Sequence, residues 1–532
     1  MKRALTVLLS VLLCVGLTAC GRRPDAPEAP EKSESWPDAV VIELSDDGIG
    51  VNAQTEAYEH AVRIDHDIVY YEEGKDFTYG EGTEADAHSA AEAENHTVVH
   101  ITQPGRYVLR GTLSAGQIAV DLGEDADEDP DAVVTLILDG VDITCTVAPA
   151  VIFYNVYECG SADTETATKD VNTSAAGANV IIADGSENIV NGSYVARIYK
   201  PDSVELSEDG TEVLDAKKLH KYDAAFYSKM SMNVDGGEAG SGILRINAAN
   251  EGLDSELHLT INGGNINITS GNDGINTNED GVSVTTINDG TLTIHVTGET
   301  GEGDGIDSNG WLVINGGKVI AAACNNSADS GIDSDMGIHI NGGTVMATGH
   351  MLDRIEAGGQ NYAVFNFAGT QSGDTVVSLK NTANEELMAL WPMNDYSVLV
   401  FSSPELTEGK YTLWSDGTQL AGSAGGFGGG MGGGFRPGGM MPGGAQIPEL
   451  EGFDPAQLPE FPVDGEEHRR PEKMEPPEGF EPPEGMERPQ GFPGGMGGRG
   501  PNGMGTQSET RSETFTVTAG GSMFSGVTIA AK

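Results

Sequence analysis

Short runs of alternating apolar and polar residues recur through the middle of the chain. They span residues 257–270, 282–298, 311–323 and 338–349, and β-branched residues are common in them. A period of two with β-branched side chains predicts half-buried β-strands rather than helices. Each run is short and is broken by glycine, so we expect many short strands linked by tight turns.

The turns inside these runs repeat at a nearly constant interval. An Asn/Asp-Gly-Gly or Asn-Asp-Gly tripeptide begins at residues 235, 262, 288, 315 and 341, which is every 26 or 27 residues. A second motif accompanies it, as "EGLDS" (251–255), "DGINT" (273–277), "DGIDS" (304–308) and "SGIDS" (330–334), and "AAFYS" (224–228) aligns as a degenerate first copy. Such self-similarity is typical of stacked repeat architectures.

Two folds would explain strands joined by Asn-Gly turns. Hairpins are the usual interpretation of such turns and would build a sandwich. Identical units with apolar faces too small to be buried alone favour stacked coils instead. We therefore predict an all-β fold, a single-stranded right-handed parallel β-helix over residues 38–420, with its clearest repeats at 223–349.

Stacking would bring the acidic turn residues into columns. Equivalent residues of adjacent parallel strands lie about 4.8 Å apart, where unpaired carboxylates repel. Cations bridging the coils would relieve this repulsion, and Ca²⁺ prefers oxygen ligands. The alternative is that these side chains only cap turns by accepting backbone N–H groups. The predicted calcium ligands are Glu251, Asp254, Asp273, Asn276, Asp304, Asp307 and Asp333.

Composition excludes one class of partner. The chain of 532 residues has 82 acidic against 29 basic side chains and a formal net charge of −53. A nucleic acid would be repelled, so none is expected as a partner. Cys145, Cys159 and Cys324 have no zinc-type spacing, and a Cys145–Cys159 disulfide is the one pairing considered.

The two ends of the chain differ from its middle. Residues 1–20 combine a basic start and a short apolar run with "LTAC", which resembles a bacterial lipobox and implies lipidation of Cys20. A flexible tether (21–37) would follow, and we expect a monomer that is anchored to the membrane and faces outward. Residues 421–510 are rich in Gly, Pro and Met and predict a disordered insertion, and strand-like residues 511–532 are expected to return to the β-helix.

The "DGIDS…INGG" units behind the lipobox resemble a known family. They are similar to the calcium-binding, carbohydrate-binding parallel β-helix proteins of Gram-positive anaerobes, as is the opening segment 101–151. The resemblance implies a pectate-lyase-like fold that binds acidic plant polysaccharide, such as polygalacturonate, or cellulose. The family's "SK" step survives only at Ser228-Lys229, and the later copies depart from it.

Three functions remain open from the sequence. A non-catalytic polysaccharide-binding lipoprotein is favoured, with Trp311 as a candidate stacking platform for sugar. A calcium-dependent pectate lyase is the alternative, and it needs a base within hydrogen-bond reach of the substrate proton. Lys229 is the candidate base because it occupies the "SK" step. A structural adhesin is the third possibility.

Overall fold

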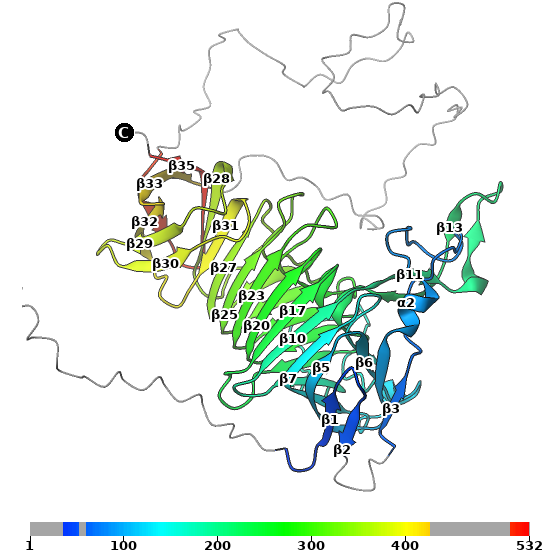
Figure 1. Cartoon of the computed structure of the whole chain (residues 1–532). Helices are drawn as coiled ribbons and strands as arrows, with labels where there is room; N and C mark the ends of the chain where they lie inside the picture. Colours follow the sequence, from blue (N-terminus) through cyan, green and yellow to red (C-terminus); the bar gives the residue numbers. More distant parts are fainter. Residues whose placement is uncertain (1–35, 53–59, 426–510, 531–532) are drawn as a thin grey trace, which may run out of the picture. The chain divides into compact units, whose positions relative to one another are not determined.

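The computed structural model describes residues 36–52, 60–425 and 511–530 (Figure 1). These residues are almost entirely β-strand, with one short α-helix, α2 (Ala90–Glu94), and the 3-10 turns η2 (Ala126–Glu128) and η3 (Pro201–Ser203). The all-β prediction is confirmed.

Two long ladders of parallel strands run through the middle of the chain (Figure 1). In the first, each strand pairs in parallel with the next: β1 (Val40–Leu44), β5 (Gly105–Leu113), β7 (Val134–Thr144), β9 (Ala178–Ile182), β16 (Met232–Asp235), β19 (His258–Ile261), β22 (Val284–Ile287), β24 (Trp311–Ile314) and β26 (Gly337–Ile340). The second branches from β7 and contains β10 (Glu187–Gly192), β17 (Ile243–Ala248), β20 (Asn265–Ser270), β23 (Thr291–Val296), β25 (Lys318–Ala322) and β27 (Thr344–Gly349).

The strand register follows the sequence repeat. Asn265 pairs with Thr291, Thr291 with Lys318, and Lys318 with Thr344. The Asn-Gly turns therefore connect a strand of the first ladder to one of the second, and each strand pairs one repeat away. Among the described strands, β19 pairs with β16 and β22, and β20 pairs with β17 and β23, so these turns do not close hairpins.

The turns themselves stack on one another. The Nδ2 of Asn288 donates to Oδ1 of Asn262 at 2.9 Å, and Asn315 and Asn341 each donate to the preceding amide at 2.9 and 2.8 Å. The last turn residue is a glycine with positive φ, for example +96° at Gly290, a conformation that only glycine adopts without strain. Each turn thus fits the one beside it through an amide ladder and bare backbone.

A third ladder completes the wall that carries the acidic motif. It contains β3 (Val62–Asp65), antiparallel to its neighbour, and then, all in parallel, β4 (Thr97–Ile101), β6 (Gly116–Asp121), β8 (Val151–Asn155), β15 (Ala224–Ser228), β18 (Glu251–Ser255) and β21 (Ile275–Thr277).

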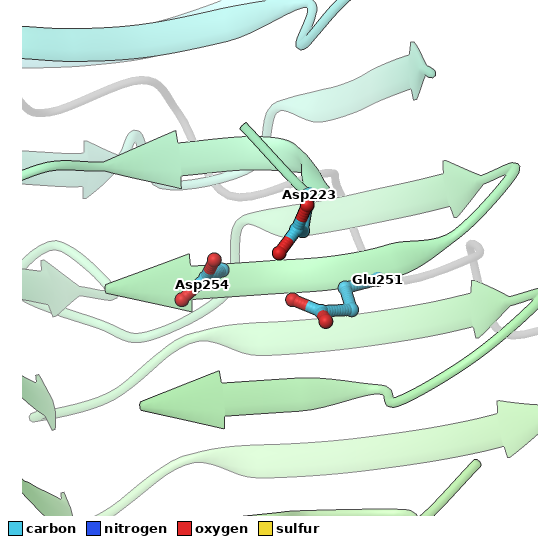
Figure 2. A group of neighbouring side chains, drawn as sticks. All are labelled: Asp223, Glu251 and Asp254. Carbon is cyan, nitrogen blue, oxygen red and sulfur yellow. The ribbon is translucent and has the colours of Figure 1, made fainter. Parts of the chain in front are cut away.

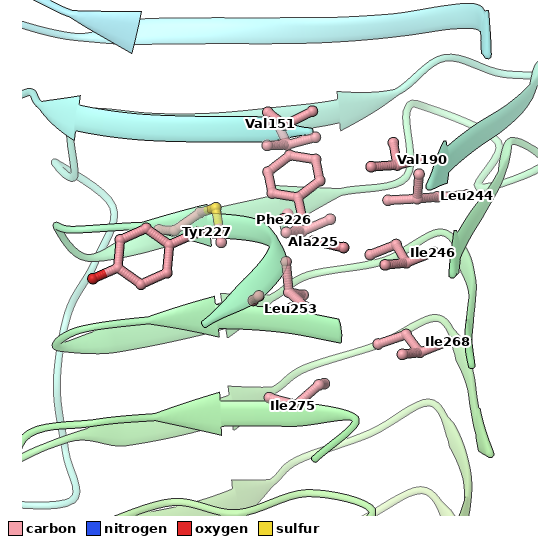
Figure 3. Packing of buried hydrophobic residues seen from close by; sticks show 14 of the residues in the cluster. Val151, Val190, Ala225, Phe226, Tyr227, Leu244, Ile246, Leu253, Ile268 and Ile275 are labelled. Carbon is pink, nitrogen blue, oxygen red and sulfur yellow. The ribbon is translucent and has the colours of Figure 1, made fainter. Parts of the chain in front are cut away.

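The core lies between the second and third ladders. Figure 3 shows Val151, Phe226, Leu253 and Ile275 in one column, each the register partner of the next. All four are at most 1% exposed. A second column of Val190, Ile246 and Ile268 faces them (Figure 3). Burial of these stacked aliphatic side chains holds successive repeats in register.

Outside these ladders, short strands form small antiparallel pairs. β2 (Gly50–Asn52) pairs with β1, β11 (Val195–Tyr199) pairs with β14 (Lys218–Tyr222), and β12 (Glu205–Leu206) pairs with β13 (Val213–Asp215).

The strands that follow β27 are mostly antiparallel. They are β28 (Tyr362–Gln371), β29 (Val377–Asn381), β30 (Glu386–Leu390), β31 (Tyr396–Ser402), β32 (Gly409–Ser415), β33 (Thr418–Ala424), β34 (Phe515–Val517) and β35 (Ser522–Ile529). β31 pairs antiparallel with both β27 and β28, and β35 joins β28 in parallel. The sheets are therefore mixed, and the finer expectation of a single parallel β-helix over 38–420 is not confirmed. The second half of the chain builds its own core here, around Phe365, Phe515 and Phe524.

Several expectations lie outside the described residues. They are the signal peptide with Cys20, most of the tether and nearly all of the 421–510 segment. No helix in the described ranges has the length and apolar character needed to span a membrane. Cys145, Cys159 and Cys324 are free thiols, so the Cys145–Cys159 disulfide is not formed.

Candidate functional site

Three carboxylates converge where the third ladder meets the first repeats. Asp223 lies directly before β15, and Glu251 and Asp254 lie on the adjacent strand β18. Figure 2 shows their side chains pointing toward one another, and one oxygen of each lies within 4.8 Å of the others. We call these three residues the acidic triad.

The acidic triad is shielded from solvent. Asp223 and Glu251 are each 4% exposed, and Asp254 is fully buried. Burial raises the pKa of Glu251 well above its usual range, and the nearby Asp223, Asp254 and Asp273 carboxyls add to that shift. The pKa of Asp254 is raised well above its usual range as well, first by burial and then by Glu256 and Asp223. Without a positive charge beside them, these groups cannot all ionise.

Two buried acceptor atoms at the triad have no protein partner. Asn276 on β21 donates its Nδ2 to Oε1 of Glu251 at 3.3 Å, but Oε2 of Glu251 and Oδ1 of Asn276 are buried without a hydrogen bond. Buried polar atoms are nearly always satisfied, so these two call for a ligand that the protein itself does not supply.

The positive charge beside the triad does not balance its three carboxylates. The Nζ of Lys221 lies 2.6 Å from Oδ2 of Asp223 and neutralises one carboxylate. The Nζ of Lys218 lies 3.1 Å from Oε1 of Glu256, so this lysine pairs with a carboxylate outside the triad. Three ionised carboxylates against one ammonium give a net charge of −2, which a divalent cation would balance.

The geometry of the triad suits a hard cation. One oxygen of each triad carboxylate lies within 4.8 Å of the others, which is close enough for all three to contact one ion through bonds of about 2.4 Å. The donor set consists of carboxylate and amide oxygens, without sulfur or imidazole, which is the set preferred by Ca²⁺ and Mg²⁺ rather than by zinc. The site could therefore hold a metal ion between two successive repeats.

The other predicted ligands lie along the same wall but are used differently. Oδ1 of Asp273 accepts the N–H of Asp304 at 2.6 Å, and Oδ1 of Asp304 accepts the N–H of Ser330. Both side chains thus cap the backbone of the next repeat, as the alternative interpretation from the sequence described.

A second carboxylate group forms further along the wall, where Asp307 and Asp333 are joined by Asp353. Burial, with the neighbouring carboxylates, raises the pKa of Asp307 and of Asp333 to about 7. The pKa of Asp353 is also raised by burial. Oδ1 of Asp333 and Oδ2 of Asp353 are buried without a hydrogen bond. These side chains are only half-buried, in contrast to the acidic triad.

The structure therefore brings together Glu251, Asp254 and Asn276, and it adds Asp223, which sequence reasoning did not select. A signal was available, because Asp223 directly precedes the degenerate repeat 224–228, and the first residue of that repeat is the register partner of Glu251. Lys221 was not selected either, because it lies on β14, before the repeat.

Within the described part of the chain, neither the candidate base, Lys229, nor the candidate sugar platform, Trp311, has a contact that points to a function. Lys229 is exposed, and its backbone N–H donates to the carbonyl of Phe153. Trp311 opens β24 and is half-buried, with Val284 and Gly337 as its register partners.

Comparison with known proteins identifies the family of this chain. The family model described as "Carbohydrate-binding domain-containing protein" matches residues 95–380, which is more than half of the chain. The chain belongs to this carbohydrate-binding domain family.

Two individual proteins resemble this chain over part of its length. A carbohydrate-binding domain-containing protein of Acetivibrio thermocellus is 28% identical over 171 residues, which cover 32% of this chain and 44% of that protein. The chain thus matches less than half the length of this relative. A solved structure, the polysaccharide lyase-like protein from C. thermocellum as a gadolinium derivative, is 19% identical and covers 57% of this chain and 83% of that one, with a TM-score of 0.29. An overlap this limited supports no argument about function.

Proposed function

We propose that this protein binds polysaccharide at the cell surface and that Ca²⁺ at the acidic triad stabilises its stacked repeats. The observation that carries the metal part is the pair of buried, unpartnered acceptors, Oε2 of Glu251 and Oδ1 of Asn276, beside two further buried carboxylates. Membership of the carbohydrate-binding domain family supports the polysaccharide part.

The burial of the triad decides what a cation would do there. A sugar cannot reach side chains that are at most 4% exposed, so the ion would not bridge the protein to a uronate at this place. It would instead join Asp223, directly before β15, to side chains of β18 and β21 and permit three carboxyls to ionise inside the fold. Calcium at the triad is therefore a structural element, and the glycan binds elsewhere.

Metal binding is tested first with the chelator-treated full-length protein. Isothermal titration with Ca²⁺ and Mg²⁺ should show binding of Ca²⁺, because a cluster of carboxylate and amide oxygens in a dry site favours the ion that sheds its water more easily. An absence of heat and of any shift in melting temperature with either ion would overturn the metal part.

Polysaccharide binding is tested separately. The calcium-loaded protein is mixed with insoluble cellulose and with immobilised polygalacturonate, and the bound fraction is measured by sedimentation. The proposed ligands are acidic plant-type polysaccharide and cellulose. Retention on neither of them would overturn the binding part and leave the metal part standing.

A calcium-dependent lyase is the second candidate. Its base would have to be a neutral lysine or arginine near a substrate-bound ion. Lys221 is the lysine nearest the triad, but Asp223 raises its pKa, which keeps it protonated against the opposing effect of burial. Incubation with polygalacturonate and calcium should therefore leave the ultraviolet absorbance of unsaturated products unchanged, and its growth would favour the lyase.

The surface location rests on the lipobox-like sequence that ends at Cys20. In this proposal the chain is a monomer, held to the outer face of the membrane only through lipid on that cysteine. Expression of wild type and Cys20→Ser in a Gram-positive host tests it. The wild type should fractionate with membranes and the variant with the medium, whereas identical fractionation would contradict anchoring.

We also propose that residues 223–349 are coils of a right-handed parallel β-helix. The three ladders with a common register of one repeat support this arrangement. A crystal structure of the calcium-loaded protein tests the handedness of the connections.

A further inference from the structure

A hollow with an exposed tryptophan lies far along the chain from the acidic triad. Its volume is about 480 Å³, and it is lined by residues of the segments 373–374 and 391–395 together with His295 and Asn325. Trp391 follows β30 and is 67% exposed, compared with 48% for Phe77, another exposed aromatic side chain. The ring is therefore open to contact by a ligand in this hollow.

The segment that presents Trp391 is firmly anchored. Asn394 is 8% exposed, and its Nδ2 donates to the carbonyls of Val296 and Ala323, at 2.7 Å in each case. These carbonyls lie at the ends of β23 and β25, so Asn394 fastens the segment to the second parallel ladder. Its Oδ1 lies 3.0 Å from Nε2 of His295, which fills the last polar position of the amide.

A second contact closes the other side of the hollow. Oδ1 of Asp395 accepts the N–H of Gly373 at 2.9 Å, which ties the turn before β29 to the segment that carries Trp391. A Cβ at Gly373 would come within 2.8 Å of the backbone of Asn394, so glycine permits the close approach. The hollow is therefore preformed, and a ligand would not have to order it.

The lining has the chemistry of a sugar site. An indole ring offers a flat apolar face, and hexopyranoses with equatorial hydroxyls have a matching face of C–H groups. Around the ring, the side chains of Asn325, Asp374 and Asp395 provide amide and carboxylate groups that hydrogen-bond hydroxyls. A mostly apolar surface with a few polar groups is typical of small-ligand sites.

Charge decides which sugars fit. Asp374 and Asp395 are both exposed at this hollow, and among its lining residues there is no lysine or arginine. A uronate carboxylate placed here would be repelled by two like charges, whereas neutral hydroxyl groups donate readily to carboxylates. The hollow therefore favours a neutral hexose over galacturonate.

We infer that the hollow around Trp391 is a binding subsite for a neutral hexose unit of a polysaccharide chain, with Trp391 stacked on the sugar ring. The inference rests on the proposed polysaccharide binding and names the place and the chemical class of the ligand. It also places glycan recognition on the antiparallel strands that follow the repeats, away from the buried acids.

The test compares wild type with Trp391→Ala in the calcium-loaded full-length protein, with cellohexaose as the neutral probe and hexagalacturonate as the acidic one. Titration calorimetry should show that the variant binds cellohexaose at least about tenfold more weakly, because the stacking surface is lost. Phe77→Ala is the matched control, an exposed aromatic ring removed outside the hollow, and it should bind as wild type does.

A charge variant adds a second readout. Asp374→Asn removes one repelling charge, so it should raise the affinity for hexagalacturonate relative to that for cellohexaose. Wild-type affinity for cellohexaose in Trp391→Ala overturns the inference while the proposed function stands. If the wild type binds neither probe and is not retained on cellulose or polygalacturonate, both fail together.

Discussion

The Nδ2 of Asn276 donates to Oε1 of Glu251 at 3.3 Å, yet Oε2 of Glu251 and Oδ1 of Asn276 are buried without a hydrogen bond. The two residues belong to neighbouring strands, β21 and β18, and the register partner of Asn276 is Asp254 rather than Glu251. This hydrogen bond thus places the two unpartnered acceptor atoms beside the carboxylates of Asp223 and Asp254.

Replacing Glu251 by glutamine should remove most of the stabilisation by calcium. The protein with Glu251→Gln loses one charged ligand but keeps its shape, so calcium affinity should fall at least about tenfold. With calcium at about one hundred times the wild-type dissociation constant, the wild type gains about 2.7 kcal/mol of stability, and the variant should gain clearly less. Urea unfolding with calcium and with EDTA measures both.

The metal-free variant provides the internal control. Burial raises the pKa of Glu251 well above its usual range, so the metal-free wild type already carries a neutral side chain there. In EDTA at neutral pH, Glu251→Gln should therefore be at least as stable as wild type, because glutamine does not have to take up a proton when the protein folds. Glu299→Gln, at an exposed acid, should match wild type in both conditions. An undiminished calcium effect in Glu251→Gln would exclude the triad as the metal site.

Mild acid should stabilise the metal-free protein. The pKa values of Asp273, Asp307 and Asp333 are raised from 3.8 to about 7, chiefly by burial. Between these values the folded state holds more protons than the unfolded state, so the free energy of unfolding falls as pH rises through this window. Thermal unfolding in EDTA should give a higher melting temperature at about pH 5 than at about pH 8.

Calcium should reduce or reverse this dependence on pH. Cation binding requires ionised carboxylates, so added calcium should raise the melting temperature more at the higher pH. A metal-free protein that is more stable at the higher pH would contradict the assignment of raised pKa values.

Breaking the amide ladder should weaken the repeats. Asn288→Ala removes one hydrogen bond to Asn262 and one from Asn315, both of 2.9 Å. These groups are exposed and can bond water instead, so the loss should be about 1 kcal/mol in the free energy of unfolding. Asn52→Ala, at an exposed position on β2, is the control. Equal stability of the two variants would show that the amide ladder contributes nothing.

A side chain at Gly290 should be far more damaging than one at a glycine with free space. Gly290 has a φ of +96°, and a Cβ there would lie 2.7 Å from the carbonyl oxygen of Gly264. Gly281 has a φ of +70° but no atom within 4 Å of its Cβ position. Gly290→Ala should cost about 3 kcal/mol or more and Gly281→Ala about 1 kcal/mol, measured by urea unfolding. Similar losses would mean that contact between turns is not limiting.

Much of the parallel region was predictable because its information is local and repeated. The alternation of apolar residues defines strands, and the constant spacing of the Asn-Gly turns predicts which strands become neighbours. The register of Asp254 with Asn276 follows from the alignment of "EGLDS" (251–255) with "DGINT" (273–277). The antiparallel strands after β27 have no repeat, so their pairing depends on long-range packing around Phe365 and was not predicted beyond their strand character.

The site was predictable only in part, for a related reason. Alignment of repeats selects equivalent acids, but it cannot tell a side chain that caps a turn, as Asp273 does, from one that faces other carboxylates, as Glu251 does. Asp223 and Lys221 lie outside the repeated motif, so its alignment does not select them, and the only signal for Asp223 is its position directly before the degenerate copy 224–228.

The sequence by itself determined the strands, the turn glycines and the columns of acids. The strands and glycines follow from local backbone sterics, and the columns follow from the regular repeat of the motif. The tertiary structure decided which acids are buried together and which face water, because burial depends on segments that the repeat does not contain. Lys221 and Asp223 come to Glu251 from a strand before the repeat, and Asn394 holds the segment of Trp391 against the ends of β23 and β25. Contacts between distant parts of the chain thus convert a regular ladder into particular sites.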